Sequence, residues 1–107
     1  MNAVLERLPE DFAAKASDAA GLLRTMGNPN RLMILCRLGG GELSVGALGE
    51  GFPLSQSALS QHLAVLRAEG LVATRKQGQS VYYRIANPGV VSIIETLASI
   101  YCPEMLK

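Results

Sequence analysis

The chain of 107 residues has no apolar run that approaches the roughly 18 residues of a membrane-spanning helix. Its first residues lack the charged segment followed by an apolar stretch that marks a secretory signal. It has two cysteines and one histidine, and it has no Cys-Xaa-Xaa-Cys motif. These absences argue against a membrane protein, a secreted protein and a dithiol oxidoreductase. They predict a cytoplasmic protein without a membrane partner.

Charged residues are also scarce, at 18% of the chain, whereas 49% of the residues are hydrophobic. A small domain has much surface for its volume, so this composition is apolar for a monomer. The excess of apolar residues predicts a buried subunit interface. No repeat, low-complexity tract or linker divides the sequence, and we therefore expect residues 1–107 to form a single domain.

Apolar residues recur at helical spacing through most of the chain. They predict five helices, over residues 10–26, 29–38, 45–48, 55–69 and 88–102. Asn28-Pro29 and Asn87-Pro88 each supply a capping side chain followed by proline at the first helical position. Gly70 stands where a helix commonly ends. A short strand is expected at 43–45, just before the third helix.

Residues 71–85 predict a β-hairpin that follows directly on the fourth helix. Val81, Tyr83 and Ile85 alternate with Tyr82 and Arg84, as expected for half-buried strands. Residues 77–80 form the tip, where glycine allows a positive φ. A helix followed by such a hairpin predicts a mainly α fold with a small β-hairpin wing, the winged helix-turn-helix.

The helix over 55–69 carries two sets of side chains. Ser55 is a natural N-cap, and an apolar stripe suited to packing contains Ala58, Leu59, Leu63 and Leu66. Between them lie neutral side chains that both donate and accept hydrogen bonds: Gln56, Ser57, Ser60, Gln61 and His62. A solvated helix face usually carries Glu, Lys and Arg instead. This polar set suits the reading of base edges in the major groove of DNA.

The distribution of charge agrees with contact to DNA. Residues 55–84 hold four basic residues against one acidic residue, a net charge of +3, whereas the rest of the chain carries −2. We expect Arg67, Arg75 and Lys76 to contact phosphates, and Gln77 and Gln79 to contact DNA from the tip of the wing. Ser55 completes the expected DNA-binding set.

Several segments resemble the ArsR/SmtB family of small dimeric bacterial repressors. The resemblance spans residues 20–102 and rests on the stretches 22–32, 42–48, 54–66, 70–72 and 81–84. It implies a homodimer that binds double-stranded operator DNA and leaves it when an inducer binds. Eight of the twelve residues from 90 to 101 are apolar, on more than one helix face. The first and last helices are therefore the expected dimer interface.

The sequence departs from the metal-sensing members of this family. Those members carry a Cys-Xaa-Cys type motif by the recognition helix, or Asp and His pairs on the last helix. Residues 42–54 have neither Cys nor His, and the last helix offers Glu95 without a histidine. Zinc needs at least three protein ligands. No metal site and no cofactor are expected, and a metal- or metalloid-responsive repressor remains an alternative.

Cys36 and Cys102 match the positions of two cysteines in the sulfide- and persulfide-responsive branch of the family. That resemblance implies a repressor that releases DNA when reactive sulfur or an oxidant links the pair. Relatives with the same cysteines act instead as activators that displace a silencer. Local chemistry alone leaves a simpler interpretation open: Cys36 lies among apolar residues and would serve as a small buried hydrophobe. No neighbour is expected to lower the pKa of either thiol.

An enzyme is not expected. A serine or cysteine nucleophile needs an adjacent base, and His62 is the only histidine, with no third group or oxyanion loop indicated. A protein-interaction module that lost DNA binding is a further alternative, against which the polar helix and the basic wing argue.

Overall fold

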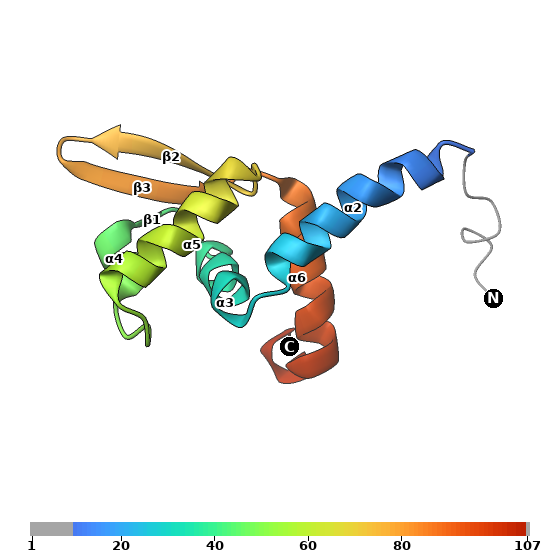
Figure 1. Ribbon diagram of the computed structural model, residues 1–107. Coiled ribbons are helices and arrows are strands. Elements are labelled where there is room, and N and C mark those ends of the chain that lie inside the picture. Colours follow the sequence, from blue (N-terminus) through green and yellow to red (C-terminus); the bar gives the residue numbers. More distant parts are fainter. Residues whose placement is uncertain (1–9, 107) are drawn as a thin grey trace.

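The computed structural model describes residues 10–106 (Figure 1). The first residues of the chain, over which no secretory signal is expected, lie outside this range. The elements follow in the order α2 (Phe12–Met26), α3 (Pro29–Leu38), β1 (Leu43–Ser44), α4 (Val45–Gly49), α5 (Gln56–Ala68), β2 (Val72–Gln77), β3 (Ser80–Ile85), α6 (Pro88–Tyr101) and the 3₁₀ turn η1 (Pro103–Leu106). Five α-helices and a hairpin within these residues confirm the predicted winged helix-turn-helix. None of the described helices is long and apolar enough to cross a membrane.

The helix ends follow from local chemistry. The Asn28 Oδ1 atom accepts hydrogen bonds from the backbone N–H groups of Asn30 (2.9 Å) and Arg31 (3.1 Å), so α3 begins where predicted. The Asn87 side chain caps α6 in the same way. Gly70 has a φ of +78°, which lets the chain turn out of α5 into the hairpin. The predicted helices agree with the observed ones to within two residues, whereas η1 was not predicted.

The three strands form one antiparallel sheet in the order β1-β3-β2. Gln77 pairs with Ser80, which leaves a two-residue loop at Gly78 and Gln79. Gly78 has a φ of +63°, and positive φ at the first loop residue is typical of a type II′ turn. The short strand β1 pairs through Leu43 and Ser44, as predicted.

The sheet has two chemically different faces, because residues paired across antiparallel strands point to the same side. Thr74 is paired with Tyr83, and Tyr83 and Ile85 pack against the hydrophobic core, so this is the inner face. Arg75 is paired with Tyr82 on the outer face. The predicted alternation along β3 is confirmed at Tyr83 and Ile85.

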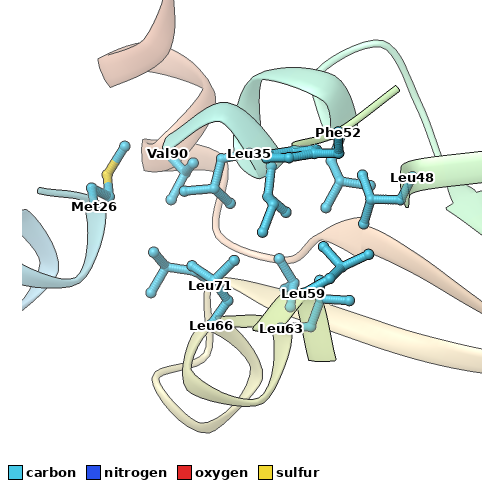
Figure 2. Packing of buried hydrophobic residues seen from close by; sticks show 12 residues of the cluster. Met26, Leu35, Leu48, Phe52, Leu59, Leu63, Leu66, Leu71 and Val90 are labelled. Carbon is cyan, nitrogen blue, oxygen red and sulfur yellow. The ribbon is translucent and has the colours of Figure 1, made fainter. Parts of the chain in front are cut away.

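The core fixes α5 against the rest of the domain. Figure 2 shows Leu59, Leu63 and Leu66 of α5 pointing toward Leu35 of α3. The largest fully buried side chains are those of Ile34, Leu35, Leu48, Leu63, Leu66, Leu71 and Val90. Each such side chain contributes about 1.5–3 kcal/mol through loss of contact with water. The outer face of α5 is therefore presented on a rigid support.

The two terminal helices are largely uncovered in the single chain. Every side chain from residue 11 to residue 20 is exposed, and α2 extends from the body away from the hairpin (Figure 1). Exposed apolar side chains include Leu23 (60%), Ile100 (62%) and Tyr101 (76%). Only Val90 of α6 is fully buried.

Candidate nucleic-acid interface

One face of α5 is free of contacts with the core. Ser57, Gln61 and Ala64 lie along the centre of this face, at helical spacing, and all three are exposed. Gln56 and Ser60 are exposed beside them. The structure thus brings four of the predicted base-reading residues to one surface, which we call the reading face (Gln56, Ser57, Ser60, Gln61 and Ala64).

Ala64 was missed by sequence reasoning, because an alanine within an apolar helix is ordinarily assigned to the core. Its spacing of seven residues from Ser57 is the signal that could have found it. An exposed alanine methyl group can contact the methyl group of thymine. The reading face therefore combines hydrogen-bonding groups with one apolar position.

Ser55 and His62 lie at the margins of the reading face. The Ser55 hydroxyl accepts a hydrogen bond from the backbone N–H of Ala58 (3.1 Å) and lies 3.4 Å from the hydroxyl of Ser57. Ser55 thus caps α5, as predicted, and fixes its N-terminal turn. His62 is half-buried on the flank that turns toward the core.

The turn before α5 is held by a side chain that sequence reasoning gave no role. Arg37 Nη1 donates hydrogen bonds to the backbone oxygens of Leu48 (3.0 Å) and Glu50 (2.7 Å). Its guanidinium carbon lies 4.6 Å from the centre of the Phe52 ring. Arg37 therefore joins α3 to α4 and to the segment between α4 and α5.

The predicted phosphate contacts lie in different settings. Arg67 is exposed in the last turn of α5, and Lys76 and Gln79 are exposed in the outer half of the wing. Lys76 is paired with Val81, which places it on the same face of the sheet as Thr74 and Tyr83. Lys76 therefore offers its ammonium group on the side of the sheet where the core packs.

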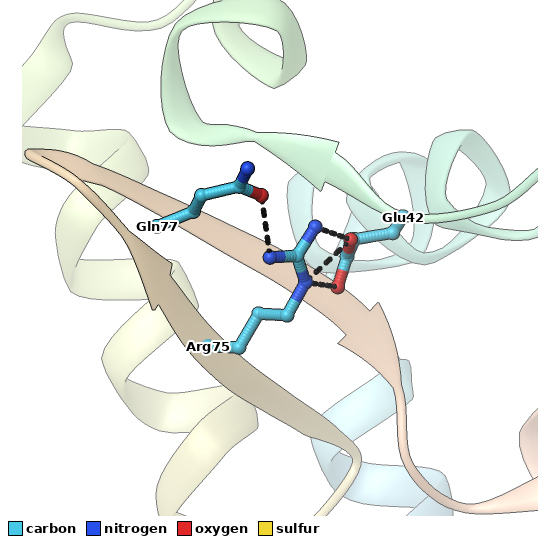
Figure 3. A network of polar contacts seen from close by, with 3 residues as sticks. All are labelled: Glu42, Arg75 and Gln77. Atoms are coloured by element: carbon cyan, nitrogen blue, oxygen red, sulfur yellow. Dashed lines mark hydrogen bonds and ion pairs between the residues drawn. The ribbon is translucent and has the colours of Figure 1, made fainter.

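Arg75 is engaged within its own chain (Figure 3). Its Nε donates to both carboxylate oxygens of Glu42 at 2.9 Å, and Nη2 lies 2.7 Å from Glu42 Oε1. Nη1 donates to the Gln77 side-chain oxygen at 2.8 Å. The hydrogen bond from Arg75 lowers the pKa of Glu42. The guanidinium also lies over the Tyr82 ring, 4.7 Å from its centre.

The two cysteines are free thiols at the ends of two helices. Cys36 lies in the last turns of α3, and half-buried Cys102 is the C-cap of α6, where its backbone N–H donates to the Ala98 oxygen (2.7 Å). Partial burial raises the pKa of Cys36, and the neighbouring Cys102 raises this pKa further. The influence of Cys102 on this pKa indicates that the fold brings the two thiols near each other across a long stretch of sequence.

The interpretation of Cys36 as a buried packing residue is wrong for the single chain. Its side chain is exposed. The buried face of α3 is made by Ile34, Leu35 and Leu38, and the helical turn carries Cys36 off that face. The apolar residues next to Cys36 in the sequence therefore did not predict that its side chain is exposed.

Known proteins share this architecture. The family model described as "Bacterial regulatory protein, arsR family" matches residues 28–74. The transcriptional activator HlyU of Vibrio cholerae is 48% identical over 93 residues, covering 87% of this chain and 86% of its own length. The chain belongs to the arsR family. Nodulation protein NolR of Rhizobium meliloti is 46% identical over 101 residues, covering 94% of this chain and 83% of its own.

Among arsR-family structures, the transcriptional repressor BigR from Xylella fastidiosa superposes with a TM-score of 0.82 at 38% identity. The match covers 90% of this chain and 98% of BigR. This chain is accordingly a DNA-binding transcriptional regulator of the arsR family. HlyU and BigR are likewise regulators rather than enzymes. The relatives named above include both an activator and a repressor.

Proposed function

We propose that the protein is a homodimeric repressor that binds double-stranded operator DNA and releases it when reactive sulfur links Cys36 to Cys102. The observation that carries the DNA-binding part is the exposed reading face on α5, which is polar, uncharged and rigidly supported by the core. Neutral hydrogen-bonding side chains at this place can both donate to and accept from the base edges of the major groove.

Base reading and phosphate contact belong to different residues in this proposal. The N-terminal part of the recognition helix reads bases, which assigns Gln56, Ser57 and Gln61 to them, with Ser60 and His62 at the edges of the contact. Arg67, Lys76 and the wing-tip amide of Gln79 contact the phosphate backbone and position the helix, whereas Gln77 lies beside Arg75 on the outer face of the sheet. Ser55 contacts DNA from the N-terminal end of α5.

The dimer uses α2 and α6. Apolar side chains on both helices, among them Phe12, Leu23 and Ile100, remain exposed in one chain. A second copy of the same chain covers them best, because a twofold axis presents identical apolar surfaces to each other. Two recognition helices then face two half-sites.

The sulfur step links the two thiols with balanced chemistry. The Cys36 thiolate attacks the central sulfur of an organic trisulfide, RS–S–SR, and expels one RS⁻. The Cys102 thiolate then attacks that same sulfur and expels the second RS⁻, which leaves a Cys–S–S–S–Cys bridge and two RSH. Both cysteine thiols are oxidised, and the donor is reduced to thiols. The nearness of the two cysteines supports this step.

The bridge acts on DNA through the position of α6. Cys36 belongs to α3, which packs in the DNA-binding core, whereas Cys102 ends α6, which carries part of the dimer interface. Tying one to the other changes how the two DNA-binding cores sit in the dimer. Coupling between two sites of this kind typically amounts to 1–3 kcal/mol, about 5- to 150-fold in affinity.

A second candidate is an activator that works by displacing a silencer from DNA. The similarity to a relative named as an activator favours it. Mobility shifts with an operator selected from random DNA, followed by transcription from that operator with and without a silencing protein, separate the two. Repression in the purified system supports the first proposal, and activation only when the silencer is present supports the second.

A further inference from the structure

Arg75 reaches across the whole sheet. It starts on β2, passes over the ring of Tyr82 on β3 at 4.7 Å, and ends on the carboxylate of Glu42, the residue before β1. Because the strand order is β1-β3-β2, this one side chain connects both edges of the sheet. Figure 3 shows its guanidinium held between Glu42 and Gln77.

The direction of Arg75 differs from that of its neighbour Lys76. Arg75 shares the outer face of the sheet with Tyr82, whereas Lys76 shares the inner face with Val81. The helices pack on the inner face, where Tyr83 and Ile85 meet the core. Arg75 therefore points away from the side of the sheet on which α5 presents its reading face.

Such a link would stabilise a sheet that is otherwise short. A two-stranded hairpin alone is marginally stable in water, and β1 adds only the two residues Leu43 and Ser44 to it. The contact with Glu42 ties the far strand of the wing to the domain. Its geometry demands arginine, because only a planar guanidinium can meet both carboxylate oxygens while it lies over an aromatic ring.

We infer that Arg75 is a positioning residue and that its contact with Glu42 sets the angle of the wing relative to α5. This replaces the sequence-based assignment of Arg75 to a phosphate. The inference rests on the proposed contact of Lys76 with DNA, because the wing must touch the backbone for its angle to matter. Arg75 itself keeps its hydrogen bonds to Glu42 and Gln77 when DNA is bound.

The sign of one substitution separates the two roles. If Arg75 positions the wing, Glu42→Gln weakens operator binding by about twofold to fivefold, the range for a surface ion pair of good geometry. If Arg75 instead contacts phosphate and Glu42 competes with it, Glu42→Gln frees the guanidinium and strengthens binding. Glu50→Gln is the matched control, since it removes an exposed acidic charge that is outside this contact.

Arginine substitutions provide the second arm. Arg75→Lys keeps the charge and would serve a phosphate, but it loses the two-oxygen contact, so we expect it to bind operator as weakly as Arg75→Gln. The double variant with Glu42→Gln should be no weaker than either single variant, because the two residues act as one unit. The slope of log affinity against log salt should stay unchanged, whereas Lys76→Gln lowers it by about one unit.

Hydrogen exchange of the free protein completes the test without DNA. Exchange of the β2 and β3 amides should be faster in Glu42→Gln, Arg75→Lys and Arg75→Gln, and unchanged in Glu50→Gln. Stronger binding by Glu42→Gln, or a reduced salt slope in Arg75→Gln, would overturn the inference. If Lys76→Gln left affinity and slope unchanged, the proposed wing contact would fail, and faster exchange would still identify the role of Arg75 within the sheet.

Discussion

Arg37 donates a hydrogen bond of 3.0 Å to the backbone oxygen of Leu48, a residue whose side chain is fully buried. This contact joins the end of α3 to the end of α4. It places a charged group where the helix-turn-helix would otherwise leave a carbonyl oxygen without a partner. A residue outside both helices thus holds the segment that joins α4 to α5.

We expect Arg37→Leu to lower the free energy of unfolding by about 1–3 kcal/mol, because the Leu48 and Glu50 oxygens lose a charged donor. Arg67→Leu, at an exposed position of α5, is the control and should change it by less than about 0.5 kcal/mol. Urea unfolding followed by circular dichroism measures both. Equal stability of the two variants would show that the Arg37 contact is dispensable.

Local chemistry explains what the sequence could predict. Asn28, Asn87 and Gly70 act on backbone atoms within a few residues, so helix ends followed directly from them. Alternation along β3 likewise depends only on spacing. The reading face followed from residue type, except for Ala64, whose exposure depends on which side of α5 meets the core.

Contacts between distant segments could not be predicted in the same way. Glu42 lies 33 residues before Arg75 in the chain, and neither segment contains a pattern that predicts their contact. The two bonds from Arg37 cross 11 and 13 residues. The exposure of Cys36 depends on the direction of α3 against its neighbours. Arg75 and Cys36 were assigned by residue type and Arg37 was given no role, whereas the fold decides which groups each side chain meets.

Replacing Leu97 with Asp tests the dimer. Leu97 is half-buried on α6, outside the described core cluster, and an unpaired carboxylate there would have to be buried in the dimer. We expect sedimentation to show a monomer at micromolar concentration and operator affinity to collapse. Glu95→Lys, at an exposed position of the same helix, serves as the charge-altered comparison. Ile94→Asp is less clean, because Ile94 packs against the core.

Gln61 is the reading-face residue best placed to test base recognition. Gln61→Ala should relax preference at one base pair of each half-site by about 1–3 kcal/mol. The operator should be roughly palindromic, with half-sites separated by about 10 bp or a multiple of it. Binding to a library of operator variants gives both quantities. A uniform loss across all sequences would move Gln61 from base reading to phosphate contact.

The Glu42 contact gives the wing a pH dependence of defined sign. The hydrogen bond from Arg75 holds the pKa of Glu42 below its unfolded value of about 4.3. The contact is therefore fully present above that value and is lost as pH falls through the lower folded pKa. Protection of the β2 amides should fall in this acid range in the wild type. In Glu42→Gln the corresponding step should be absent, and a step of equal size there would implicate another group.

The dithiol switch gives the most stringent test of the proposed function. Treatment with an organic trisulfide should add one sulfur atom and remove two hydrogens per chain, and peptide mapping should place the bridge between Cys36 and Cys102 of the same subunit. Operator affinity should fall about 5- to 150-fold and recover with a thiol reductant.

Because the pKa of Cys36 is raised, the rate of bridge formation should increase with pH through the neutral range as more thiolate forms. Cys36→Ser and Cys102→Ser should each bind operator normally and ignore the donor. A direct disulfide requires Cα atoms within about 7 Å, and an inserted sulfur relaxes that limit, so peroxide should act more weakly than the trisulfide. If either single variant released DNA as fully as the wild type, one thiol would suffice, and a bridge between α3 and α6 could not be the cause of release.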